Sequence, residues 1–279
     1  GRAMGEISLS GLEKMQGEAN KKFIESYDAA QKASEKAAAA EEAFYKAAQD
    51  YTFGDMSDES FQKKEAAQKA MEEAKAEAEA AEKAMEEAAA EAQTAGEAVE
   101  NKKEELRKNR DNDTTYVVHC ARIECSKGMR ESYLVLGPTH GVKTRQIPQM
   151  TIKDILPEMN VINFGGCFST ENPSVKAAAE AAVMAAQKTI EDKHNQKGCV
   201  GRFLDNVVDW FVGDHEMSVD ESLMQQCVEE CLAGFSENPK WEKGHEKVTV
   251  NGEPVLLRRC SLTCNYGGCI TILVSGQPE

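Results

Sequence analysis

Cysteine is the residue type in this chain with the clearest capacity for chemistry. Three of the nine cysteines stand beside glycines at the end of a short apolar stretch, in "ARIECSKG", "NVINFGGC" and "SLTCNYGG". Glycines let turns pack closely together, so Cys125, Cys167 and Cys264 can meet at one point. Three thiolates need one more ligand to make a tetrahedral zinc site. The repeat therefore predicts structural zinc, with buried free thiols and a labile disulfide as alternatives.

Spacing alone leaves the fourth ligand open, because the chain lacks the paired CxxC knuckles of many zinc sites. His140 is the first choice, since it also lies in a glycine-containing turn, "PTHGV". Cys199 in "KGCVG" is the second choice. Cys227 and Cys231 stand four residues apart, so they share one face of a helix and are interpreted as packing within it.

Covalent catalysis is the other chemistry that cysteine and histidine suggest. His119 and Cys120 are adjacent, but neighbouring residues of a strand point to opposite faces, so they do not form a nucleophile–base pair. The familiar local protease motifs are also missing from the sequence. We therefore expect a protein that is not an enzyme, a prediction that is weaker for the first 110 residues.

The first 110 residues contain no Cys, His, Trp or Pro, and they are dominated by Ala, Glu, Lys and Gln. Small and apolar residues recur there at alternating spacings of three and four, from Ala30 to Tyr51 and from Met71 to Val99. This pattern predicts a coiled-coil seam. Between the runs, Gly54 can end one helix and Ser57 can cap the next. We expect residues 4–112 to form an antiparallel helical hairpin.

The second half, from residue 114 to 279, is predicted to consist of short strands and turns with helices inserted between them. Strands are expected within residues 116–168 and at the C-terminus. One helix is expected over residues 173–192, with Asn172 as its N-cap, and further helices over residues 203–236. Asn251 and Gly252 predict a hairpin turn. The expected fold class is α+β, an Ala-rich helical hairpin followed by a mainly β domain with a helical insertion.

The formal net charge of −15 excludes the basic surface that nucleic acids require, and it disfavours an anionic membrane surface. Neither a membrane anchor nor a signal peptide is expected from the sequence. In the absence of a secretory signal, nine cysteines are more consistent with thiols or metal ligands than with a disulfide framework.

Several motifs of the second half resemble the PAAR-like proteins, a family long catalogued as a domain of unknown function. The motifs are "TYVVHCARIECSKG", "LVLGPTHGV", "NFGGCFSTENPSV", "WEKGHEKVTVNGEPVLL" and "SLTCNYGGCITILVSGQ", and they occur in the family's order across residues 114–279. The hairpin lies outside the resemblance. Two departures are Cys120, where relatives commonly have Gly, and Cys269, where they have an aliphatic residue. Both join Cys199 as alternative ligands, as does Cys260.

The resemblance implies a small conical domain that caps the trimeric, VgrG-like spike of a contractile injection system, such as type VI secretion. Zinc would stiffen its apex, and the helical hairpin would be an arm for docking an effector or adaptor. Such a protein assembles in the bacterial cytoplasm and is exported with the spike. Two rival interpretations are a secreted effector whose helical domain is cargo or toxin, and a cytosolic zinc-stabilised scaffold unrelated to injection.

Overall fold

The computed structural model describes residues 7–54, 56–195, 230–231, 234–236 and 238–278. The chain divides into two compact units, Gly1–Glu105 and Leu106–Glu279, here called the hairpin unit and the β unit. The first is built from a helical pair, and the second from small antiparallel sheets and an α-helix. The predicted α+β fold class is therefore confirmed.

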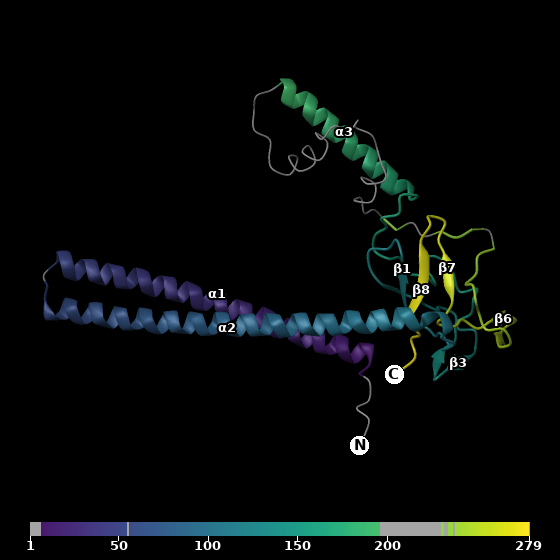
Figure 1. Cartoon of the computed structure of the whole chain (residues 1–279), viewed down its shortest axis with the longest axis horizontal. Coiled ribbons are helices and arrows are strands. Elements are labelled where there is room, and N and C mark those ends of the chain that lie inside the picture. Colours follow the sequence, from purple (N-terminus) through teal and green to yellow (C-terminus); the bar gives the residue numbers. More distant parts are fainter. Residues whose placement is uncertain (1–6, 55, 196–229, 232–233, 237, 279) are drawn as a thin grey trace, which may run out of the picture. The chain divides into compact units, whose positions relative to one another are not determined.

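Two long helices form the hairpin unit, α1 (Leu9–Phe53) and α2 (Asp58–Asn109), whose last turn continues past the unit's boundary (Figure 1). The helix ends are specified locally. The Ser8 hydroxyl accepts a hydrogen bond from the Gly11 N–H at the start of α1. A Cβ at Gly54 would lie 2.2 Å from a backbone oxygen of the preceding turn, so glycine is required where α1 ends. Ser57 caps α2 as predicted, accepting from the Ser60 N–H.

The predicted seam lies between the two helices. Each of its positions from Ala30 to Tyr51 and from Met71 to Val99 is buried or half-buried, while charged residues cover the outer faces. Ion pairs join the helices across this seam. In one of them, Lys75 Nζ lies 3.4 Å from the Glu41 carboxylate. Further ion pairs between the two helices are Lys22–Glu91 and Lys36–Glu77. Residue numbers fall along one helix as they rise along the other, so the pair is antiparallel.

A four-stranded antiparallel sheet with the order β2-β1-β8-β7 forms the centre of the β unit. Its strands are β1 (Arg122–Cys125), β2 (Ser132–Tyr133), β7 (Ser261–Thr263) and β8 (Cys269–Val274). Figure 1 shows β1, β8 and β7 side by side. In this register Cys125 lies opposite Ile270, so the end of β1 and the turn between β7 and β8 share one end of the sheet.

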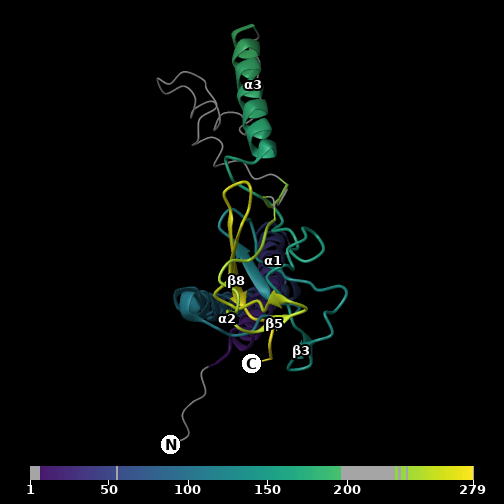
Figure 2. The same cartoon turned by 90° about the vertical axis from the view of Figure 1, so that its right-hand side faces the viewer.

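The described residues also form two two-stranded ribbons. One pairs β3 (Lys143–Thr144) with β4 (Ile147–Pro148), and the other pairs β5 (Thr249–Val250) with β6 (Glu253–Pro254). The predicted turn at Asn251 and Gly252 joins β5 to β6, and both residues have positive φ, as a type I′ hairpin turn requires. Figure 2 shows β3 at the opposite end of the unit from the β7–β8 turn.

A hydrophobic core lies on the sheet and includes the fully buried side chains of Trp241 and Phe164. The short 3₁₀ helix η1 (Arg110–Asn112) follows α2. Helix α3 (Pro173–Asn195) begins where predicted, because the Asn172 side chain accepts a hydrogen bond from the Ser174 N–H at 2.9 Å. Within the described residues, no helix has an apolar stretch of the length that a bilayer requires.

The helices predicted over residues 203–236 lie mainly outside the described residues. The described members of that range, residues 230–231 and 234–236, are not helical. Their backbone instead hydrogen-bonds to other segments of the β unit, as when the Asn265 N–H donates to the Gly234 carbonyl at 2.8 Å. The predicted helix is therefore wrong at its C-terminal end, where tertiary hydrogen bonds replace helical ones.

Candidate metal centre

Four cysteine side chains line one small pocket at the end of the sheet: Cys125, Cys167, Cys231 and Cys264. Cys125 is the last residue of β1, and Cys264 follows the last residue of β7. Cys167 lies in the loop that precedes α3, and Cys231 lies in the short described stretch 230–231. Three of these thiols are those that the cysteine–glycine repeat predicts to converge.

The turns after Cys125 and Cys264 are built alike. The Gly128 N–H donates to the Cys125 carbonyl at 3.0 Å, and the Gly267 N–H donates to the Cys264 carbonyl at the same distance. Gly267 has a φ of +76°, a conformation that favours glycine. The repeated sequence unit is thus a repeated structural unit in these two cases.

The third turn pairs with the first. Gly128 and Cys167 form an isolated antiparallel bridge, and the Phe168 N–H donates to the Lys127 carbonyl at 3.1 Å. The Ser169 hydroxyl also donates to the Tyr266 carbonyl, which lies in the turn after Cys264. Hydrogen bonds therefore connect all three turns around the pocket.

Glycine at two positions makes this close approach sterically allowed. A Cβ on Gly268 would lie 2.7 Å from the Cys125 Sγ, and a Cβ on Gly128 would lie 2.7 Å from the Phe164 Cβ. Contacts this short do not occur between real side-chain atoms, so any larger residue would push the turns apart. The glycines of the repeat keep the thiols near one another.

Two of the thiols accept backbone hydrogen bonds from the residue two positions later. The Lys127 N–H donates to the Cys125 Sγ at 3.5 Å, and the Ser169 N–H donates to the Cys167 Sγ at 3.4 Å. Amide hydrogen bonds of this kind stabilise negative charge on sulfur and orient it, as outer hydrogen bonds do for metal ligands.

Burial raises the pKa of the Cys125 thiol to about 11, and the nearby thiols of Cys264, Cys231 and Cys167 act in the same direction. The thiol is therefore neutral at neutral pH when no cation is close. A bound dication reverses this balance, because coordination stabilises the thiolate and displaces the proton.

The donor set fits zinc better than it fits a hard cation. The lining residues contribute four sulfur ligands and no carboxylate, and soft thiolates favour zinc over magnesium or calcium. Within the described ranges, no three His, Cys, Asp or Glu side chains already stand in a metal-binding arrangement. Tetrahedral zinc holds sulfur at about 2.3 Å, so binding requires the four side chains to turn inward within the pocket they share.

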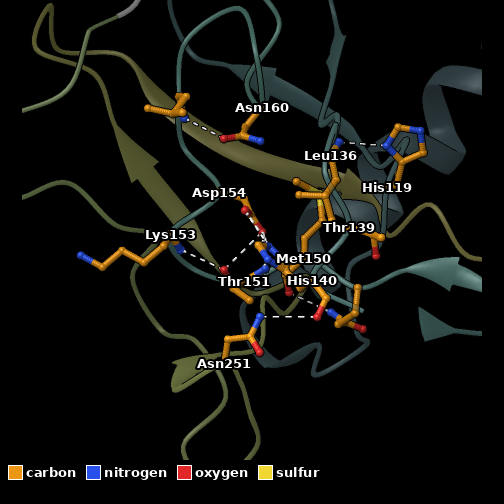
Figure 3. Close-up of polar contacts among 12 residues, drawn as sticks. His119, Leu136, Thr139, His140, Met150, Thr151, Lys153, Asp154, Asn160 and Asn251 are labelled. Atoms are coloured by element: carbon orange, nitrogen blue, oxygen red, sulfur yellow. Dashed lines mark hydrogen bonds and ion pairs between the residues drawn. The ribbon is translucent and has the colours of Figure 1, made fainter. Parts of the chain in front are cut away.

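His140, the first choice for the fourth ligand, does not line this pocket. Its Nε2 lies 2.9 and 3.0 Å from the two carboxylate oxygens of Asp154, and its carbonyl oxygen accepts a hydrogen bond from the Asn251 side chain (Figure 3). The buried Asp154 also accepts from the Thr151 N–H at 2.7 Å. His140 therefore fastens its loop to the turn that contains Asp154.

The other candidates of the sequence also lie apart from the four thiols. Cys269 and Cys120 are exposed and are missing from the pocket lining, and Cys199 lies outside the described residues. Figure 3 shows His119 accepting a hydrogen bond from the Leu136 N–H, a contact that fixes the chain locally. Cys260 is fully buried in the core and accepts a hydrogen bond from the Leu257 N–H.

Sequence reasoning missed Cys231. Its spacing from Cys227 suggested a shared helix face, whereas the structure places it beside three other thiols. No local motif marks it, because the contacts that hold the stretch around it come from Asn172 and Asn265, which are distant in sequence.

The fold and the pocket define a small α+β protein with a thiol-lined centre. The family model described as Domain of unknown function (DUF4280) matches residues 117–277, more than half of the chain. The chain belongs to this family, and the matched range contains all four pocket cysteines. Searches of curated proteins and of solved structures found no match.

Proposed function

We propose that this chain is a non-enzymatic, PAAR-like spike-tip protein that caps the trimeric spike of a contractile injection system. The observation that supports this proposal best is the shared pocket of Cys125, Cys167 and Cys264. These residues belong to the motifs on which the resemblance to PAAR-like proteins rests, and the family match covers the same part of the chain. Hydrogen bonds also join the three turns that carry these cysteines around one point, which suits the compact tip of such a domain.

A structural metal suits the architecture of the β unit. Its strands are two to six residues long, so sheet pairing alone gives limited rigidity. Small domains commonly gain the missing stability from a metal crosslink. We expect zinc to be held by Cys125, Cys167 and Cys264 with one further ligand, and to stiffen the end of the sheet that would form the tip.

We further propose that the hairpin unit docks an effector or adaptor before export from the bacterial cytoplasm. Several large apolar side chains of α1 are exposed, including Ile24 and Tyr45 at 59% each. A groove between the helices is lined by small and apolar residues together with two glutamates and one lysine. These residues are Ala30, Ser34, Ala37, Lys75, Ala78, Glu79, Glu82 and Met85. A partner helix with small apolar and basic residues would suit this surface.

Binding to a spike tests the central proposal. The full-length chain is mixed with a trimeric spike protein encoded in the same genome, and native mass spectrometry measures the stoichiometry. We expect one chain per spike trimer, and weaker binding by a Cys264→Ser variant that lacks zinc. A chain that contains zinc but binds no such trimer would favour the cytosolic scaffold.

A growth assay distinguishes between two roles of the hairpin unit, a docking arm and a toxin. The full-length chain is expressed in a bacterial host, beside a variant that lacks residues 4–110. If the hairpin unit is a docking arm, growth should be unchanged with the full-length chain and with the deletion variant. Growth arrest that disappears with the deletion would instead support an effector whose helical domain is delivered by the PAAR-like part.

A further inference from the structure

Cys231 is held in place from both sides by hydrogen bonds to the segments that carry the other thiols. On one side, the Asn172 side-chain amide donates to the Glu230 carbonyl at 3.1 Å. On the other side, the Asn265 N–H donates to the Gly234 carbonyl at 2.8 Å. Cys231 itself packs against the hydrophobic core. The short stretch around Cys231 thus runs between the start of α3 and the turn after Cys264.

Asn172 has two separate roles at this place. Its fully buried side chain caps α3 by accepting from the Ser174 N–H, and the same side chain donates to the Glu230 carbonyl. The residue at which α3 starts therefore also holds the chain at Glu230. This contact brings the stretch before α3, with Cys167, next to the stretch that contains Cys231.

We propose that Cys231 is the fourth ligand of a four-cysteine zinc site with Cys125, Cys167 and Cys264, and that the bound ion fastens the stretch before α3 and the stretch around Cys231 to the sheet. Cys167 precedes α3 and Cys231 comes after α3 in the chain, whereas Cys125 ends β1 and Cys264 directly follows β7. One ion would therefore join four separate chain segments of the β unit. Crosslinks that close a long stretch of chain restrict the unfolded state most.

The arrangement of the donors supports a metal over a set of disulfides. All four cysteines are free thiols in the structure, and backbone N–H groups donate to the Cys125 and Cys167 sulfurs, as outer hydrogen bonds do for metal ligands. A disulfide would use two sulfurs and leave the other pair facing the same apolar pocket, whereas one tetrahedral ion uses all four.

This inference rests on the proposed zinc centre and is independent of the spike-tip role. The full-length chain is purified under reducing conditions without chelator, and its zinc is measured by mass spectrometry. We expect about one zinc per chain, as one tetrahedral site implies. Wild-type protein with less than about half an equivalent, or with disulfides between these cysteines, would overturn both the zinc centre and the role of Cys231, whatever the outcome of spike binding.

A Cys231→Ser variant tests the fourth ligand directly, with Cys269→Ser as a matched control at an exposed thiol outside the pocket. We expect Cys231→Ser to lower zinc affinity at least ~10-fold in competition with a chelator, because outer contacts alone change affinity by that factor. Cobalt substitution should show a weaker sulfur-to-metal charge-transfer band in Cys231→Ser and an unchanged band in Cys269→Ser. Wild-type affinity and spectrum in Cys231→Ser would refute the assignment.

A Cys231→His variant covers the case in which Cys231→Ser fails to fold. Three cysteines and one histidine form a common zinc site, so this variant should recover zinc binding and give a cobalt spectrum shifted toward nitrogen coordination. A side chain that only packs against the core would give no such shift. An unchanged cobalt spectrum in Cys231→His would therefore contradict coordination by residue 231.

Amide hydrogen exchange tests whether the ion fastens the stretch before α3 and the stretch around Cys231 to the sheet. In the wild-type protein, removal of zinc should speed amide exchange in residues 167–176 and 230–236, while residues around Asn251 and Gly252 serve as an internal reference in the same unit. An Asn172→Asp variant keeps the cap and loses the donor to Glu230, so its exchange at residues 230–236 should depend on zinc more strongly. Equal exchange with and without zinc would overturn the fastening role.

Discussion

The guanidinium of Arg258 and the carboxylate of Asp113 form an ion pair in which Nε lies 2.6 Å from Oδ2. Arg258 is almost fully buried, with 4% of its surface exposed. Its remaining nitrogens donate to three backbone carbonyls, those of Leu106, Ile272 and Leu273. One side chain thus joins the beginning of the β unit to strand β8.

Replacing Arg258 with Met should lower the free energy of unfolding of the β unit by about 3–5 kcal/mol, the usual cost of removing one partner of a buried ion pair. Tryptophan fluorescence in urea measures it, because both tryptophans belong to the β unit. Arg259→Met is the control, since Arg259 is half-buried and its guanidinium donates to the backbone carbonyls of Lys243 and Gly244. Equal losses in the two variants would contradict this role for Arg258.

Gly268→Ala should separate the cysteine turns, because the new Cβ would lie 2.7 Å from the Cys125 Sγ. Overpacking of this kind typically costs about 1–3 kcal/mol, and we also expect weaker zinc binding. Gly137→Ala is the matched control in the same unit, because no atom lies within 4 Å of its Cβ position. Thermal unfolding and chelator competition check both variants. A Gly268→Ala protein with wild-type zinc affinity would show that the turns tolerate the separation.

Local patterns predicted much of the fold. The heptad spacing placed the seam from Ala30 to Val99 correctly, because helix packing repeats along the chain itself. Asn172 as a cap and Asn251 with Gly252 as a turn were also predicted, and both depend on backbone conformations set by neighbouring residues. The sequence therefore predicts the hairpin, the start of α3 and the β5–β6 turn.

The membership of the thiol pocket was only partly predictable. Cys125, Cys167 and Cys264 share a local motif, so their grouping could be read from the sequence. Cys231 has no such motif, and its position depends on hydrogen bonds to Asn172 and Asn265, which are distant in sequence. His140 sits in a glycine-containing turn like the pocket cysteines, but the partner that fixes it, Asp154, cannot be identified from spacing.

His140→Ala should leave the zinc content unchanged and should destabilise the β unit. The side chain bonds the buried Asp154 instead of lining the pocket, so its loss leaves a carboxylate with fewer partners. An unsatisfied buried acceptor costs about 1–3 kcal/mol. Zinc analysis and urea unfolding measure the two effects. Loss of zinc from His140→Ala would instead favour the ligand set of Cys125, His140, Cys167 and Cys264.

The buried thiol of Cys260 gives a prediction about alkaline pH. Burial raises its pKa from the ordinary 9.0 to about 11, against the lowering effects of the Leu257 N–H and the nearby Arg259 and Lys243. The folded state thus favours the protonated thiol. The contribution to stability is complete below about pH 9 and is lost as the pH rises through the folded pKa near 11.

A Cys260→Ala variant isolates this contribution, because every other titrating group is common to both proteins. At about 1.4 kcal/mol per pKa unit, the wild-type protein should lose roughly 2 kcal/mol more than the variant between pH 9 and pH 11. Urea unfolding at several pH values under reducing conditions measures the difference. The variant should be less stable at pH 7, because the core loses a sulfur atom. If the two stability curves run parallel up to pH 11, the Cys260 thiol does not titrate from a buried, protonated state.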